Sequence, residues 1–162
     1  MTNVALKLHS ATACRFARES LEPKLWSEIL PLLQAHWLEV RPYEDIPLQP
    51  SVAAYAGLQS VGALRLCTAR NSDGELFGYA SFIVVPDIHY STSIQATCDV
   101  LYVSPERRGA TSIKFLEWCD AQLAEEGVQV ITHHTKLSHN FGKLLERKGY
   151  TPINLTYSKK LY

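Results

Sequence analysis

The stretch that decides the fold runs from Val103 to Trp118, with the sequence VSPERRGATSIKFLEW. It starts as the end of a strand, passes through a turn with two arginines and a glycine, and continues as an amphipathic helix. The first amides of a helix lack partners and carry partial positive charge, so a helix N-terminus binds anions readily. These residues alone leave two interpretations open, an anion cradle or a solvated turn capped by Thr111 or Ser112. A P-loop is excluded, because no Gly-Lys-Ser/Thr follows.

The elements next to this stretch predict an α/β unit. Residues 94–103 alternate as a strand, with Cys98 and Val100 on one face and Asp99 and Leu101 on the other. After the turn, helical spacing predicts an apolar stripe and a glycine stop, made of Ile113, Leu116, Cys119, Leu123 and Gly127. The short run VQVIT then predicts a buried strand. A strand–helix–strand unit implies that its two strands are parallel.

A long helix is expected before this unit. Apolar residues recur at helical spacing over residues 21–40. Ser20 is a suitable N-cap and Pro23 suits the first turn, whereas Pro31 is expected to kink or split the helix.

A second helix and a hairpin follow the first helix. The second helix is expected between a Ser51 cap and a Gly62 stop. Residues 63–70 and 76–85 flank the turn NSDGE and predict an antiparallel pair of strands.

The C-terminal part predicts a last helix and a last strand. One side of the helix carries apolar residues and a glycine ends it, namely Leu137, Phe141, Leu144, Leu145 and Gly149. Residues 151–162 alternate as a strand. The order of elements indicates an α/β protein with a mixed sheet.

Composition predicts one globular domain spanning residues 1–162. Sixteen Lys and Arg balance sixteen Asp and Glu, so bulk charge does not favour nucleic acid or an anionic membrane. The chain shows no signal-peptide core and no apolar stretch near the roughly 20 residues that cross a bilayer. We therefore expect a soluble, cytoplasmic protein. Four widely spaced cysteines favour structural thiols in a reducing compartment, and they are Cys14, Cys67, Cys98 and Cys119.

The order of elements resembles the GCN5-related N-acetyltransferase (GNAT) superfamily. The turn resembles the family's pyrophosphate signature, Arg/Gln-x-x-Gly-x-Gly/Ala, with Arg107, Ala110 and Ser112 at the matching positions. Residues 32–40, 74–109 and 144–162 look like the compact GNAT proteins of tailed bacteriophages. The resemblance covers roughly residues 20 to 162. It implies an α/β fold with a mixed, mostly antiparallel central sheet and helices on both faces.

The resemblance implies that acetyl-CoA, or another acyl-CoA, is the cofactor. The main chain of Leu101, Tyr102 and Val103 would bind the pantetheine arm, and an N–H of that strand would hold the oxyanion. The pyrophosphate would lie on the turn and the first helical turn, at Arg107, Arg108, Gly109, Ala110, Thr111 and Ser112. Ser138 stands where many family members have an asparagine, and Leu145 stands where many have a tyrosine that protonates the thiolate.

Several residues are candidates for handling the acceptor amine, which must lose a proton before it attacks. Asp99 resembles the family's acidic strand residue, and burial would raise its pKa toward that of a useful base. The alternative is a carboxylate tied to nearby donors. The loop residues His89 and Tyr90 match a pair in the phage-type proteins, with plain surface placement as the alternative.

Further candidates lie on the first helix and after the short parallel strand. His36 and Glu39 share one face of the helix that flanks the acceptor site in the family; an ordinary helix-surface pair is the alternative. His134 and Lys136 are expected to line the site, and we expect no metal, because His133 and His134 point to opposite faces of a strand.

The resemblance implies an N-acetyltransferase acting on a primary amine of a small molecule or protein, encoded by a phage and active in the host cytoplasm. Two alternatives stay open, a non-catalytic binding protein and an acyltransferase for a modified nucleobase. The second would use a basic groove of Arg107, Arg108, Lys136 and Lys143. The sequence also leaves a homodimer open.

Overall fold

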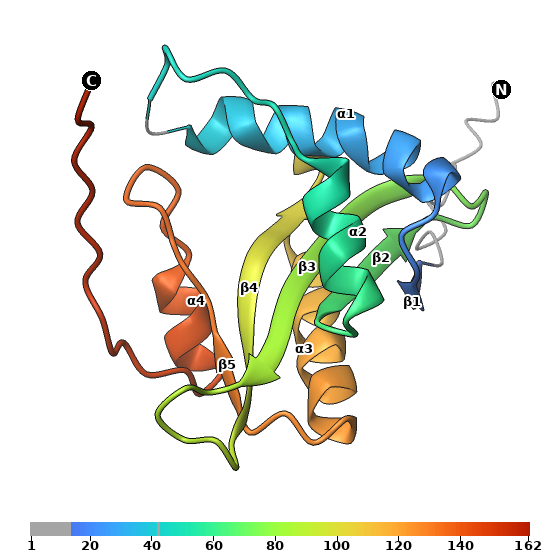
Figure 1. Cartoon of the computed structure of the whole chain (residues 1–162). Coiled ribbons are helices and arrows are strands. Elements are labelled where there is room, and N and C mark those ends of the chain that lie inside the picture. The colour runs from blue at the N-terminus through green and yellow to red at the C-terminus, as the bar shows by residue number, and fades with distance from the viewer. Residues whose placement is uncertain (1–13, 42) are drawn as a thin grey trace, which may run out of the picture.

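The computed structural model describes residues 14–41 and 43–162, and Figure 1 shows a twisted sheet between helices. The strands lie side by side in chain order, β1 (Arg15–Glu19), β2 (Leu64–Arg70), β3 (Leu76–Pro86), β4 (Ile94–Val103) and β5 (Val130–Thr132). The helical elements are α1 (Pro23–Val40), α2 (Val52–Ser60), the 3₁₀ turn η1 (Pro105–Arg107), α3 (Ala110–Glu125) and α4 (Gly142–Arg147). Among the strands of the described residues, only β4 and β5 pair parallel. The predicted mixed, mostly antiparallel sheet with helices on both faces is confirmed.

Helix α1 is one continuous helix. Its N-cap is Glu22, which makes no side-chain cap bond, so the prediction of a Ser20 cap is wrong. Pro23 occupies the first turn as predicted, since its fixed φ suits that position. Pro31 does not split the helix. Leu25 and Leu33 are buried on either side of it, and this packing holds both halves against the sheet.

Helix α2 and the hairpin follow the sequence predictions. Ser51 is the N-cap, and its Oγ accepts a 3.2 Å hydrogen bond from the Ala54 amide. Gly62 ends the segment with a φ of 70°, which favours glycine. β2 and β3 pair antiparallel, and the Asn71 side chain accepts two backbone bonds inside their turn.

The two ends of the described chain differ from the predictions. The sequence patterns do not indicate β1, which pairs antiparallel with β2. Helix α4 begins only at Gly142, so Leu137 lies outside it and is exposed. Residues 151–162 are exposed and form no regular element, so the predicted last strand is wrong. Alternation favours a strand, but a strand also needs a neighbouring edge with which to pair.

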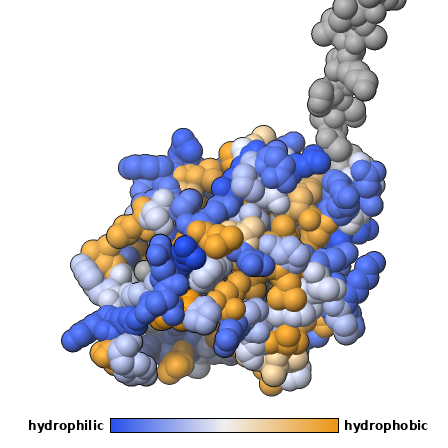
Figure 2. All heavy atoms as spheres, turned by 90° about the horizontal axis from the view of Figure 1, so that it is seen from above, coloured by the Kyte–Doolittle hydropathy of each residue, from blue (hydrophilic) through white to orange (hydrophobic). Residues whose placement is uncertain are grey.

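The sheet has two different cores. Against α3 lies an apolar core whose centre is fully buried, with Ala80, Phe82, Ala96, Phe115 and Cys119 at or near zero exposure. Against α1 and α2 lies a second core that includes two tyrosines, with Leu25, Ile29, Leu33, Leu66, Tyr79, Val100 and Tyr102. Figure 2 shows hydrophobic and hydrophilic side chains interspersed over the side of the molecule that carries α1.

A β-bulge interrupts β4. Ser81 of β3 pairs with Val100 and the next residue, Phe82, pairs with Cys98, so Asp99 has no partner on β3. An extra residue reverses the alternation of side chains beyond it. Cys98 therefore belongs to the α3 core while Val100 belongs to the α1/α2 core. The prediction that Cys98 and Val100 share a face is wrong for this reason.

Candidate functional site

The candidate site is built on the last half of β4. Strand β5 pairs with only three β4 residues, from Gln95 to Thr97, and from Cys98 onward β4 pairs with β3 alone within the described chain. The backbone of the segment from Leu101 to Val103 therefore has one edge outside the sheet pairing. The side chains of Tyr102 and Val103 are buried, so this segment offers its main chain rather than its side chains to a ligand.

The turn after β4 ends in an uncapped helix N-terminus. Gly109 is the N-cap of α3, with a φ of 90° that favours glycine, and no side chain caps the helix there. The alternative of a turn capped by Thr111 or Ser112 is therefore not observed. The first backbone bond into the helix is donated by the Ile113 amide, so the amides of residues 110–112 have no partner within the helix. The Ser112 Oγ is buried and has no hydrogen-bond partner among the described residues.

The two arginines of the turn have different surroundings. Arg108 donates from Nε to the Val103 carbonyl at 2.8 Å and from Nη2 to both carboxylate oxygens of Glu39 at 2.9 and 2.8 Å. Arg107 lies over the Phe77 ring at 5.7 Å and forms no ion pair with a described residue. Arg108 therefore links the turn to α1, whereas the charge of Arg107 has no carboxylate partner among the described residues.

Helix α1 brings His36 and Glu39 to the end of β4. The His36 ring lies 5.3 Å from the Tyr102 ring, and the Tyr102 hydroxyl donates to Glu39 at 3.4 Å. Burial lowers the pKa of His36, and the Glu39 charge opposes that effect. A lowered pKa favours the neutral form of the imidazole. Glu39 is held by Arg108, whereas the His36 nitrogens make no hydrogen bond with a described residue.

Asp99 lies on the same side of the sheet as α1 and α2. Its Oδ2 accepts hydrogen bonds from the Tyr55 hydroxyl at 2.9 Å and the Ser81 hydroxyl at 3.1 Å. Asp99 is exposed, so the burial expected from its apolar strand is absent. The bulge explains the difference, because it turns Asp99 out of the regular pleat.

The remaining candidates are exposed and make no side-chain hydrogen bond with a described residue of this cluster. His89 and Tyr90 are exposed in the loop before β4, at the opposite end of that strand from the turn, and Asp87 Oδ1 accepts from both of their amides. His134 is exposed after β5. Ser138 is exposed in a turn before α4 and so lies outside the helix in which the family pattern expects it.

The expected basic groove is not a free set of cations. Arg108 is paired with Glu39, and Lys143 lies 3.6 Å from Glu146. Within residues 14–41 and 43–162 no group of three His, Cys, Asp or Glu side chains could hold a metal. None of the helices described is long and apolar enough to cross a membrane. Cys67, Cys98 and Cys119 are buried free thiols, while Cys14 is an exposed one.

Sequence patterns did not indicate three hydroxyl residues near Asp99. Tyr55 and Ser81 bind its carboxylate, and the Tyr79 hydroxyl is buried without a hydrogen-bond partner among the described residues. The one signal in the sequence is Ser81, a serine inside an apolar strand. Its hydroxyl is buried in the structure, and a buried hydroxyl needs a hydrogen-bond partner.

Comparison with solved structures identifies the fold. No family model and no curated protein sequence matches the chain. A predicted acetyltransferase with acetyl-CoA from Clostridium acetobutylicum superposes with a TM-score of 0.69 and 11% identity, covering 92% of this chain and 97% of that one. Ribosomal-protein-alanine N-acetyltransferase from Brucella melitensis biovar Abortus 2308 gives 0.66 and 17%, covering 93% and 99%.

A plant enzyme gives a similar result. Glucosamine-6-phosphate N-acetyltransferase from Arabidopsis thaliana superposes with a TM-score of 0.67 and 14% identity, covering 91% of this chain and 99% of that one. At such identities the likeness shows the fold, and the fold is the GNAT fold that the sequence resemblance implied. The resemblance to phage proteins in particular stays a prediction.

Proposed function

We propose that the protein is an acyl-CoA-dependent N-acyltransferase that moves an acetyl group, or another acyl group, onto a primary amine of a small molecule or protein. The observation that carries the proposal is the continuity between the unpaired edge of β4 and the uncapped N-terminus of α3. A strand edge pairs with an extended amide chain, and a helix N-terminus binds phosphate. Acyl-CoA has an amide-containing arm attached to a pyrophosphate, so it matches both features in order.

The residues present fit this ligand. The amides of residues 110–112 have no partner within the helix, and the Arg107 guanidinium of the preceding turn pairs with no carboxylate of a described residue. Gly109 faces open space, with nothing within 4 Å of where a Cβ would stand. We assign the pyrophosphate to this turn and the pantetheine arm to the main chain of residues 101–103.

The chemistry is a direct transfer. A bound acyl-CoA supplies a thioester, which is a good acyl donor. The acceptor first loses the extra proton of its ammonium form to water. Its neutral nitrogen then forms a bond to the acyl carbon while the carbon–sulfur bond breaks, and the nitrogen gives up a second proton. His36 is neutral because burial lowers its pKa, so it is our candidate for taking that proton. Leu145 is buried and has no proton to give, so we expect solvent to protonate the leaving thiolate.

A charge placed on the first turn of α3 tests the proposal. Ala110→Glu puts a carboxylate at the exposed first position of the helix, where a negative charge favours the helix but repels a pyrophosphate. Ala121→Glu makes the same change at an exposed position in the middle of α3 and serves as the matched control.

We expect wild type and Ala121→Glu to bind acetyl-CoA in a calorimetric titration of the full chain. Ala110→Glu should bind at least ~10-fold more weakly, with a thermal stability no lower than that of the wild type. Failure of the wild type to bind acetyl-CoA or CoA would overturn the proposed function. Equal binding by both variants would place the pyrophosphate elsewhere.

A further inference from the structure

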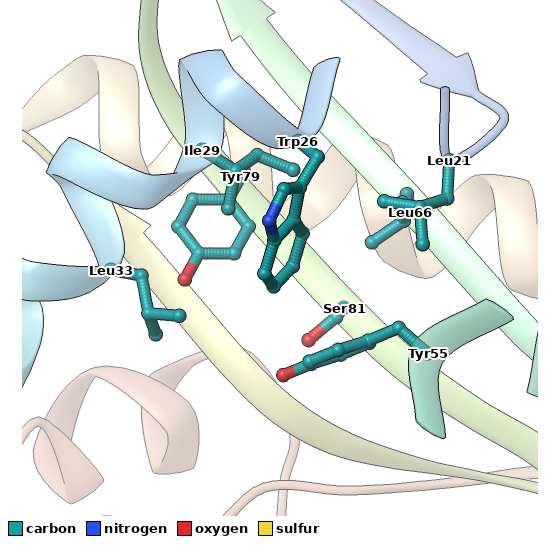
Figure 3. Close-up of a pocket in the computed structure, with 8 residues that line it drawn as sticks. All are labelled: Leu21, Trp26, Ile29, Leu33, Tyr55, Leu66, Tyr79 and Ser81. Atoms are coloured by element: carbon teal, nitrogen blue, oxygen red, sulfur yellow. The ribbon is translucent and has the colours of Figure 1, made fainter. Parts of the chain in front are cut away.

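Connected polar groups lie at the C-terminal end of β4. Figure 3 shows the cavity on the same face of the sheet, between α1, α2 and β3, where mainly leucine, isoleucine and aromatic side chains form the wall. Such a wall offers few hydrogen bonds to a ligand that carries amides and phosphates. At the end of β4, by contrast, Glu39, Tyr102 and Arg108 form one connected group. This group contacts the main chain of Val103, which belongs to the edge that we assign to the pantetheine arm.

The backbone groups of β4 point alternately toward β3 and toward the free edge. The Ser104 amide donates to the Phe77 carbonyl of β3 at 2.8 Å. The Val103 carbonyl belongs to the same trans peptide and therefore points away from β3. Residues two apart in a strand direct their backbone groups to the same edge, so the amide and the carbonyl of Leu101 also face the free edge. Tyr102, between them, directs its backbone groups to β3.

Arg108 closes the last carbonyl of this edge. Its Nε donates to the Val103 carbonyl at 2.8 Å, so the groups left open toward a ligand are both backbone groups of Leu101 and the amide of Val103. Both carboxylate oxygens of Glu39 accept from Nη2 of the same guanidinium, at 2.9 and 2.8 Å. The guanidinium also lies over the Tyr102 ring at 5.5 Å. A planar guanidinium binds a carbonyl and a carboxylate at once in a fixed geometry, which a lysine ammonium does not reproduce.

Stability alone does not account for the pair of Glu39 and Arg108. Glu39 lies in the last turn of α1, where the partial negative charge of the helix end disfavours a carboxylate. The two side chains are 25% and 41% exposed, and an ion pair between such side chains contributes little stability. What the pair does fix is the geometry of the turn, because it connects α1, the end of β4 and the residue before Gly109.

We propose that Arg108, held by Glu39, is a positioning residue that sets the register in which acyl-CoA pairs with β4. The inference rests on the proposed acyltransfer and assigns two positioning residues to the same site. With the Val103 carbonyl closed, an amide chain finds both a donor and an acceptor only at Leu101. Pairing one step further along the strand would move it by two residues, about 6.8 Å, which is more than twice the length of a hydrogen bond. Glu39 then serves the cofactor and does not deprotonate the acceptor.

The pair is tested first in the protein without a ligand. Hydrogen exchange of the Arg108 Nε–H, followed by NMR, should be at least ~10-fold slower in the wild type than in Glu39→Gln. Glu44→Gln removes a carboxylate from the loop after α1, where Glu44 lies 3.7 Å from Arg41, and is the matched control. The control should leave the exchange at Arg108 unchanged. Equal exchange in the wild type and Glu39→Gln would overturn the inference, because Glu39 would not hold the guanidinium.

Crystal structures with CoA test the register itself. In the wild type the arm should bond to Leu101, with the bond between Arg108 and Val103 still in place. Arg108→Lys keeps the charge and should bind CoA within ~3-fold of the wild-type affinity in calorimetry. In its structure the arm should reach the Val103 carbonyl. A wild-type arm on that carbonyl, or an arm in the wild-type register in Arg108→Lys, would overturn the inference.

Turnover separates positioning from proton transfer. An alanine-terminated peptide and glucosamine 6-phosphate are suitable amines to try with acetyl-CoA. Glu39→Gln and Arg108→Lys should each lower kcat ~10-fold with little change in the KM of acetyl-CoA, and the double variant should be no slower than the slower single one. The shape of the pH profile of kcat/KM should not change. Loss of its acidic limb in Glu39→Gln would make Glu39 a base and would overturn the inference. Failure of the wild type to bind CoA would reject the proposed function, whereas the exchange of the Arg108 Nε–H judges the pair on its own.

Discussion

The two faces of the sheet differ in how completely they are packed. On the α3 face, Phe82, Phe115 and Cys119 are fully buried, and the helix adds Leu123 to the same core. On the α1/α2 face, α2 contributes no fully buried residue, and the Tyr79 hydroxyl borders a cavity. The difference indicates that the α3 face carries most of the stability. The α1/α2 face carries the polar groups that we assign to the acceptor.

The largest expected effect tests whether the α3 face carries most of the stability. Phe115→Ala removes a fully buried ring from the α3 core and should cost about 3–5 kcal/mol of unfolding free energy. Leu58→Ala removes a half-buried side chain from α2 and should cost about 1 kcal/mol. Urea denaturation of both variants measures the contrast, and equal losses would show that the two faces share the stability.

A pH effect probes a weak point of the α3 face. His133 packs edge-on against Phe82, Phe141 and Tyr150, and neither ring nitrogen has a partner among the described residues. Burial, with a smaller contribution from His134, lowers its pKa to about 4. Between pH 6.5 and about pH 4, His133 is protonated in the unfolded chain but neutral in the folded chain. Stability should therefore be full above pH 6.5 and fall between pH 6.5 and 4.

The loss of unfolding free energy due to His133 should amount to no more than about 3 kcal/mol, and it should stay constant below pH 4. His133→Phe should flatten that part of the profile relative to wild type. The comparison removes the contribution of other groups near the ring, chiefly Asp120, which accepts from Tyr150. A wild-type profile identical to that of His133→Phe would contradict the prediction.

The smallest effect is local to the α1/α2 face. Ser51→Ala removes the N-cap bond of α2 and should cost about 1 kcal/mol or less. Because α2 buries no residue fully, the change should appear as faster amide exchange within α2, with little change in the exchange of β3. Faster exchange throughout β3 would show that α2 is coupled to the sheet more tightly than its burial suggests.

Local signals in the sequence predicted much of the fold. Pro23 and Ser51 marked helix starts, and Gly127, which has a φ of 86°, marked the end of α3. The turn before α3 was placed correctly, because small residues and a glycine determine the backbone there. Such features depend on neighbours in the chain, so a single sequence contains them.

The predictions that were wrong concern features that depend on residues distant in the chain. The bulge at Asp99 is set by the register of β4 against β3, which alternation within one strand does not reveal. Residues 151–162 have the pattern of a strand but pair with no strand of the sheet. The hydroxyls of Tyr55 and Ser81 reach Asp99 from 44 and 18 residues away along the chain.

The bulge also has an evolutionary consequence. A strand residue in a regular pleat has a fixed burial, so changing it alters the packing of one core. Asp99 is an extra residue with no partner on β3, and it belongs to neither hydrophobic core. Single substitutions there can change the polar group beside Tyr55 and Ser81 while leaving both cores as they are. Deleting the residue would restore the regular alternation with Cys98 and Val100 still on opposite faces, and it would remove the side chain that accepts from Tyr55 and Ser81. The position is therefore one at which either a point mutation or the loss of one residue leaves the two cores on their own faces.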